Sequence, residues 1–209
     1  MTNCAVHSGI DAKHALDVMR IRQRNIDRRT VVEKYAVYDC QKKGRRTPAF
    51  AAWDWSQADA IDREMGCAQL KTGVPAGYLL WEEIEVTMED LRECSVDVKL
   101  FPGKKRRVGL LERDGELVGW KPDRETAWYE DICRGRTFDE TAPMLLRPAV
   151  SGEFPARWYV EDGSGRAIAF VANQHLFDPS QTLAIGYLGH KPDPRSRFMQ
   201  DKFPELLCR

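Results

Sequence analysis

The sequence lacks the features by which several common classes of protein are recognised. It has no Cys-x-x-Cys pair, and its 6 cysteines are scattered at wide, irregular intervals. That absence argues against a zinc site. There is no Gly-x-x-x-x-Gly-Lys-Ser/Thr motif, so no P-loop is present. No apolar run approaches the roughly 20 residues that a membrane helix needs.

An excess of charge is also absent, because 32 basic residues balance 32 acidic ones. Overall charge therefore indicates no class of partner, and only its distribution along the chain is informative. The first residues show no basic segment followed by an apolar stretch. We therefore expect no secretory signal, reduced cysteines, a cytoplasmic location and no association with a membrane.

Three stretches differ in character and predict an organisation into residues 1–74, 75–190 and 191–209. The first is expected to be a helical, partly basic extension, because apolar residues recur near helical spacing between Ala12 and Arg46. A linker is expected at Lys71–Tyr78, which contains two glycines and a proline. The last stretch contains three prolines and is expected to be a loosely packed tail.

The basic residues of the first stretch leave two interpretations open. In the first they form the solvated face of a helix. In the second they contact nucleic acid, since a positive stripe beside Trp53 and Trp55 would combine phosphate neutralisation with base stacking. Interleaved acids such as Asp27 and Glu33 weaken the second interpretation.

Residues 75–190 predict an α/β domain of the α+β type, in which a small mixed sheet packs with helices. Thr87, with Asp90 three residues later, is a typical helix N-cap. Pro148 implies that its strand lies at an edge of the sheet or ends there. We expect strands at 84–87, 96–100, 107–112, 117–120, 144–150 and 158–161, and helices at 88–93 and 124–134.

The loop from Asp162 to Arg166 is the strongest candidate for function, and two structures fit its pattern. As a hairpin turn it would join two strands, because Asp-Gly and Ser-Gly supply positive φ angles. Alternatively, the strand ends at Glu161 and a helix begins near Arg166. Backbone amides at the helix start and the Arg166 guanidinium would then bind phosphate. Ser164 could add a hydroxyl donor, and Glu161 or Asp162 could hold a metal ion or accept a proton.

A second candidate is a run of four cations that directly follows Pro102-Gly103. Such a run in a turn can be merely solvated. It can also hold a polyanion such as DNA close to the loop described above. The residues of this candidate nucleic-acid site are Lys104, Lys105, Arg106 and Arg107.

The order of strand, helix, proline-containing strand and strand–Asp-Gly-x-x-Arg–helix resembles the ParB/sulfiredoxin superfamily. The resemblance covers about Leu79 to Asn173. In that superfamily the short loop joins a strand to a helix and binds nucleotide phosphates. The resemblance therefore implies a site for ATP or another nucleotide, with Arg166 in the phosphate-binding place. Its expected binding residues are Asp162, Gly163, Ser164, Gly165 and Arg166.

The chain also departs from the family pattern. Gly165 stands where many members carry a functional side chain, and the loop has no cysteine for sulfiredoxin chemistry. The helix-turn-helix module of chromosome-partitioning ParB proteins is missing as well. The chain therefore most resembles stand-alone members, such as plasmid fertility-inhibition proteins of the Osa type.

That resemblance implies hydrolysis of nucleotide, an action on DNA and inhibition of conjugative DNA transfer. The catalytic residues would be Glu161, Asp162 and Arg166, and Mg²⁺ is the metal that such a reaction could use. The alternative is a catalytically inactive protein on the same fold that binds a partner protein.

Overall fold

A mixed β-sheet forms the centre of the protein, seen in a computed structural model that describes residues 19–70, 74–96, 106–107, 127–138, 143–150 and 156–208. Within these ranges the strand order is β1-β2-β7-β5-β6-β3-β4. The pairs β7–β5 and β6–β3 are parallel and the others antiparallel. The expected α/β class with a mixed sheet is therefore confirmed. The strands are β1 (Arg20–Asp27), β2 (Tyr78–Val86), β3 (Cys94–Val96), β4 (Arg106–Arg107), β5 (Met144–Pro148), β6 (Trp158–Asp162) and β7 (Ala184–Pro192).

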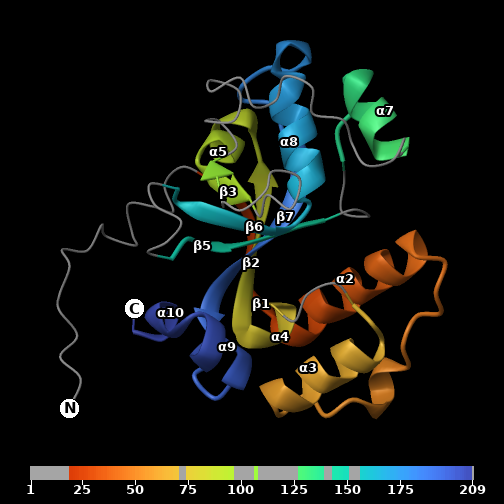
Figure 1. The fold of residues 1–209 in the computed structure, drawn as a ribbon, viewed down its shortest axis with the longest axis vertical. Helices are drawn as coiled ribbons and strands as arrows, with labels where there is room; N and C mark the ends of the chain where they lie inside the picture. Colours follow the sequence, from red (N-terminus) through yellow and green to blue (C-terminus); the bar gives the residue numbers. More distant parts are fainter. Residues whose placement is uncertain are drawn as a thin grey trace.

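Helices cover both faces of this sheet, as Figure 1 shows. One face carries α5 (Met88–Arg92), α7 (Ala127–Cys133) and α8 (Ser164–Ala172). The other carries α2 (Arg28–Lys42), α3 (Ala58–Cys67), α4 (Val74–Gly77), α9 (Arg197–Lys202) and α10 (Pro204–Leu207). Short 3₁₀ turns lie at Phe50–Ala52 and Gln174–Leu176.

Each face of the sheet has its own apolar core, because successive side chains of a strand point to opposite faces. On β2, Ile84 packs into the core beneath α8, together with Phe170. Trp81 packs into the core beneath α2, together with Tyr35 and Tyr187. The two cores bring together segments from both ends of the described chain.

The first part of the basic segment is a strand, so the expected helix is wrong for residues 20–27. β1 is an edge strand that pairs antiparallel with β2. Helix α2 begins only at Arg28, where Asp27 caps it by accepting from the Thr30 amide at 3.0 Å. Three ion pairs join β1 to β2: Arg20–Glu85 at 3.8 Å, Arg22–Glu83 at 3.4 Å and Arg24–Glu82 at 3.6 Å.

The end of the chain is packed, which corrects the expected loose tail. Met199 of α9 and Leu206 of α10 are buried in the core beneath α2. A Cβ atom added at Gly77 would lie 2.6 Å from the Met199 sulfur, so any larger residue at position 77 would force the Met199 side chain of α9 to shift. The expected linker is also corrected, because Val74–Gly77 is a buried helical turn; residues 71–73 lie outside the described ranges.

A buried ion pair between Arg28 and Asp193 joins the start of α2 to the segment after β7. Arg28 donates from Nη1 to the Ala76 carbonyl at 2.9 Å and to Asp193 Oδ2 at 3.1 Å, and the Asp193 side chain is fully buried. Burial alone would raise the pKa of Asp193. Hydrogen bonds from Arg195 and the charge of Arg28 outweigh it and lower the pKa below its ordinary value of 3.8.

We expect Asp193 to make folding depend on pH below about 4. A carboxyl group whose pKa is lowered by folding stabilises the folded state above its unfolded pKa, and this stabilisation is lost as the pH falls through the folded pKa. Asp193→Asn should therefore be less stable than wild type at pH 6, and the difference should shrink on acidification. Urea unfolding between pH 3 and pH 7 measures this, with Glu89→Gln as an exposed control. A difference that stayed constant over this range would contradict the role of the charge.

Candidate functional site

The loop that follows β6 joins a strand to a helix, so the hairpin alternative is wrong. β6 ends at Asp162, Gly163 adopts φ 98° and ψ 8°, and α8 begins at Ser164. The helix thus starts two residues earlier than the expected start near Arg166. β6 lies between β5 and β3 within the sheet. The backbone arrangement on which phosphate binding was predicted is therefore present.

Gly163 is the residue that permits this abrupt change of direction. Its positive φ is one that side-chain-bearing residues rarely adopt. A Cβ atom at this position would lie 3.0 Å from Met144 Cγ and 3.2 Å from Arg166 Nη2. The turn therefore needs glycine both for its backbone conformation and for the close packing of its neighbours.

The start of α8 presents amide groups that no side chain caps. Gly163 has no side chain to accept from them, and the first bond of the helix runs from the Ala167 amide to the Gly163 carbonyl at 2.9 Å. First-turn amides have no carbonyl partner within a helix, and together with the helix dipole they favour an anion. Ser164 and Gly165 are half-buried at this point. The Ser164 hydroxyl donates back to the Val160 carbonyl at 3.2 Å and is thus already engaged.

Arg166, whose guanidinium was expected to bind phosphate, is buried. Only 4% of the residue is exposed. Its Nη2 donates to the Pro143 carbonyl at 3.0 Å, and its Cζ lies 5.5 Å from the ring centroids of both Tyr38 and Phe138. Tyr38 belongs to α2 and Phe138 follows α7, so Arg166 connects layers on opposite faces of the sheet. Its surroundings indicate a role in positioning the loop.

Glu161 is held by an arginine that the sequence analysis did not select. Arg147 on β5 donates from Nε to Glu161 Oε1 at 2.5 Å and from Nη1 to the Pro148 carbonyl at 3.0 Å. The Arg147 side chain is 1% exposed, and its Cζ lies 4.2 Å from the ring centroids of Tyr159 and Phe203. The sequence feature that could have drawn attention to Arg147 is its charge within the otherwise apolar run of β5. A carboxylate engaged in this way is poorly placed to act as a general base.

Asp162 lies in a row of facing residues that crosses four strands. Asp162 pairs with Leu145, Leu145 with Tyr187, and Tyr187 with Glu83. Facing residues in neighbouring strands share a face of the sheet, and Tyr187 lies in the core beneath α2. Asp162 itself is buried, with 2% exposed.

The other end of this row is a polar network that sequence reasoning missed. Lys34 of α2 donates to the Tyr187 hydroxyl at 2.8 Å, and that hydroxyl donates to Glu83 Oε2 at 3.0 Å. Burial raises the pKa of Tyr187, and the neighbouring Glu83 adds to the rise although Lys34 opposes it. Its members lie far apart in the chain, so no local pattern could have indicated the network.

The candidate nucleic-acid residues are only partly within the described chain. Lys104 and Lys105 lie outside it, and of Arg106 and Arg107 only the backbone is described, as strand β4 beside β3. Trp53 and Trp55 stack on each other with ring centroids 5.4 Å apart, and Trp53 is buried. The two tryptophan rings therefore contact each other, and the arginines of β1 form ion pairs with β2. Both sets of side chains that were expected to contact nucleic acid thus have partners within the protein.

Comparison with known proteins identifies no relative: no family model, no curated protein and no solved structure matches the chain. Among the described residues there is no cluster of three or more histidine, cysteine or acidic side chains that could hold a metal ion. No helix in the same part of the chain is long and apolar enough to cross a membrane. The start of α8 therefore remains the feature with the clearest chemical capacity, namely the binding of an anion.

Proposed function

We propose that the protein binds the phosphate groups of ATP or another nucleotide at the start of α8, on a fold of ParB/sulfiredoxin type. The observation that carries this proposal is the sequence β6–Gly163–α8, in which a strand ends, one glycine turns the chain, and an uncapped helix begins. The same order of elements led to the resemblance. Backbone amides at a helix start recognise phosphate without any particular side chain.

The roles of the loop residues differ from those that the resemblance implies. The amides of Ser164 and Gly165 are the proposed phosphate donors. Arg166 orients the loop from within the protein, because its guanidinium is buried. Glu161 is paired with Arg147 and Asp162 is buried, so neither fits the place of a Mg²⁺ ligand in this arrangement.

We expect a charge placed at the start of α8 to decide whether nucleotide binds. Ser164→Asp should weaken ATP binding at least about tenfold relative to Ser164→Asn, since the two side chains have nearly the same shape and only the first repels phosphate. The aspartate should also stabilise the helix start by about 0.3–1 kcal/mol, through the dipole. Calorimetric titration with ATP, alongside thermal melts, separates these effects. Equal ATP affinity in the two variants would remove the start of α8 as the site.

Nucleotide hydrolysis, an action on DNA and inhibition of conjugative transfer are further proposals that rest on the resemblance. Release of phosphate from ATP by the purified protein tests the first of them. An inactive protein that binds a partner protein is the alternative function. Binding of ATP without release of phosphate would favour this alternative.

A further inference from the structure

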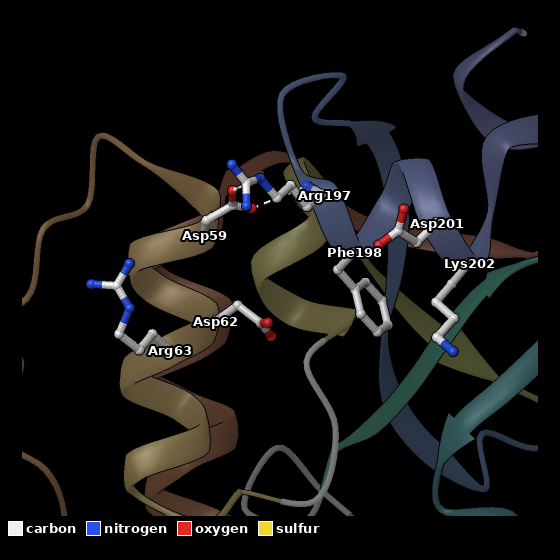
Figure 2. Close-up of a pocket in the computed structure, with 7 residues that line it drawn as sticks. All are labelled: Asp59, Asp62, Arg63, Arg197, Phe198, Asp201 and Lys202. Atoms are coloured by element: carbon white, nitrogen blue, oxygen red, sulfur yellow. Dashed lines mark hydrogen bonds and ion pairs between the residues drawn. The ribbon is translucent and has the colours of Figure 1, made fainter.

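A hollow lies between helices α3 and α9, away from α8. It has a volume of about 450 Å³, which is within the range of small-molecule sites. Figure 2 shows that α3 supplies one wall and α9 the other. Its lining residues are Asp59, Asp62, Arg63, Arg197, Phe198, Asp201 and Lys202.

The two acidic residues of α3 that line the hollow, Asp59 and Asp62, differ in whether a basic residue is paired with them. Asp59 accepts from the Arg197 amide at 3.0 Å, and its Oδ2 lies 3.5 Å from Arg197 Nε, so its charge is compensated. Asp62, three residues further along the same helix face, has neither a hydrogen bond nor an ion pair with any described residue. Its carboxylate points into the space beside Phe198, whereas Arg63 points away from it (Figure 2).

The electrostatic environment of Asp62 is that of an uncompensated anion. Burial raises the pKa of Asp62 above its ordinary value of 3.8, and the neighbouring Asp59 raises it further. The hollow also carries the basic residues Arg63, Arg197 and Lys202. Of these, Arg197 is paired with Asp59, and Arg63 points away from Asp62 (Figure 2). A positively charged group entering the hollow would supply the partner that no described residue provides.

We propose that the hollow between α3 and α9 binds a small organic cation, a protonated amine or a guanidinium carried on a short aliphatic stem. Asp62 accepts from the cation. The ring of Phe198 provides an apolar and cation-attracting wall for the stem and the charge. Asp201 of α9 adds a second carboxylate on the opposite wall.

Calorimetric titration of the full chain with 1,4-diaminobutane and with butylguanidinium, at pH 7.5 and low ionic strength, tests this proposal. We expect saturable binding of one molecule per chain. Asp62→Asn should weaken binding at least about tenfold, since it removes a charge-assisted hydrogen bond. The same substitution should leave the melting temperature unchanged or higher, because it removes an uncompensated charge. Glu64→Gln removes an acid from the same helix outside the hollow and should bind as wild type does.

A capped tripeptide, acetyl-Gly-Lys-Gly-amide, shows whether the cation belongs to a partner protein or to a free small molecule. Binding of this peptide as tightly as 1,4-diaminobutane would support a lysine side chain of a partner protein as the occupant. Binding of the free amines alone would support a small molecule. The proposal is overturned if no probe binds saturably, if potassium chloride at matched ionic strength gives the same heat, or if Asp62→Asn binds as wild type does.

Discussion

Replacing Arg147 with methionine is expected to lower the free energy of unfolding by about 3–5 kcal/mol. Arg147 is buried against the rings of Tyr159 and Phe203, and it is paired with Glu161. Methionine retains much of the packing volume but removes the positive charge and the hydrogen bond that Arg147 gives to the Glu161 carboxylate. For a chain of this length the melting temperature should fall by about 6–20 °C. Thermal and urea unfolding measure the change.

Two further variants show whether the lost charge is the cause. Adding Glu161→Gln to Arg147→Met should recover part of the stability, because the negative charge that Arg147 had balanced is removed as well. Arg157→Met should cost less than about 1 kcal/mol, since that arginine is 46% exposed and lies 3.9 Å from Glu93. If Arg147→Met and Arg157→Met had equal effects, the buried pair would not be the source of the stability.

Replacing Arg166 with alanine is expected to cost about 2–3 kcal/mol of stability, or about 5–10 °C in melting temperature. The guanidinium is buried, donates to the Pro143 carbonyl and lies close to Tyr38 and Phe138, so its removal leaves an unbonded carbonyl and a void. Arg46→Ala, at an exposed arginine, should leave the melting temperature nearly unchanged.

The same variant separates positioning of the loop from contact with phosphate. If Arg166 acts by positioning, Arg166→Ala should lose both stability and ATP affinity, and Arg166→Lys should restore only part of each, because lysine lacks the planar donor geometry. Direct contact with phosphate would instead lower ATP affinity at an unchanged melting temperature. ATP titrations and thermal melts on both variants distinguish the two outcomes.

Local patterns in the sequence predicted those parts of the fold that local physics determines. The Thr87 and Asp90 pair does form a reciprocal cap at the start of α5. Pro148 does end β5, as a residue without an amide hydrogen should. The strand–glycine–helix turn at Gly163 was one of two structures that the loop pattern allowed, and φ of 98° shows why a glycine stands there.

Features that depend on distant residues could not be predicted in this way. The arginines of β1 alternate as in a strand, but their partners are glutamates of β2, about 60 residues further along the chain. Burial of Arg166 depends on Tyr38 and Phe138, which come from separate helical layers. Strand β7 was not predicted either, because its neighbours β2 and β5 lie far back in the chain.

The position of β7 determines when the protein can fold during its synthesis. Residues 184–192 form a strand that lies between β2 and β5 and pairs with both. During synthesis, the strand pairs β1–β2 and β5–β6 would therefore leave the ribosome before β7. Until β7 follows, the edges of β2 and β5 lack the strand with which they pair. They can join only when β7 leaves the exit tunnel. Such late, non-local pairing slows folding and leaves open strand edges exposed in the meantime, so the nascent chain should depend on chaperones until its last strand has been added.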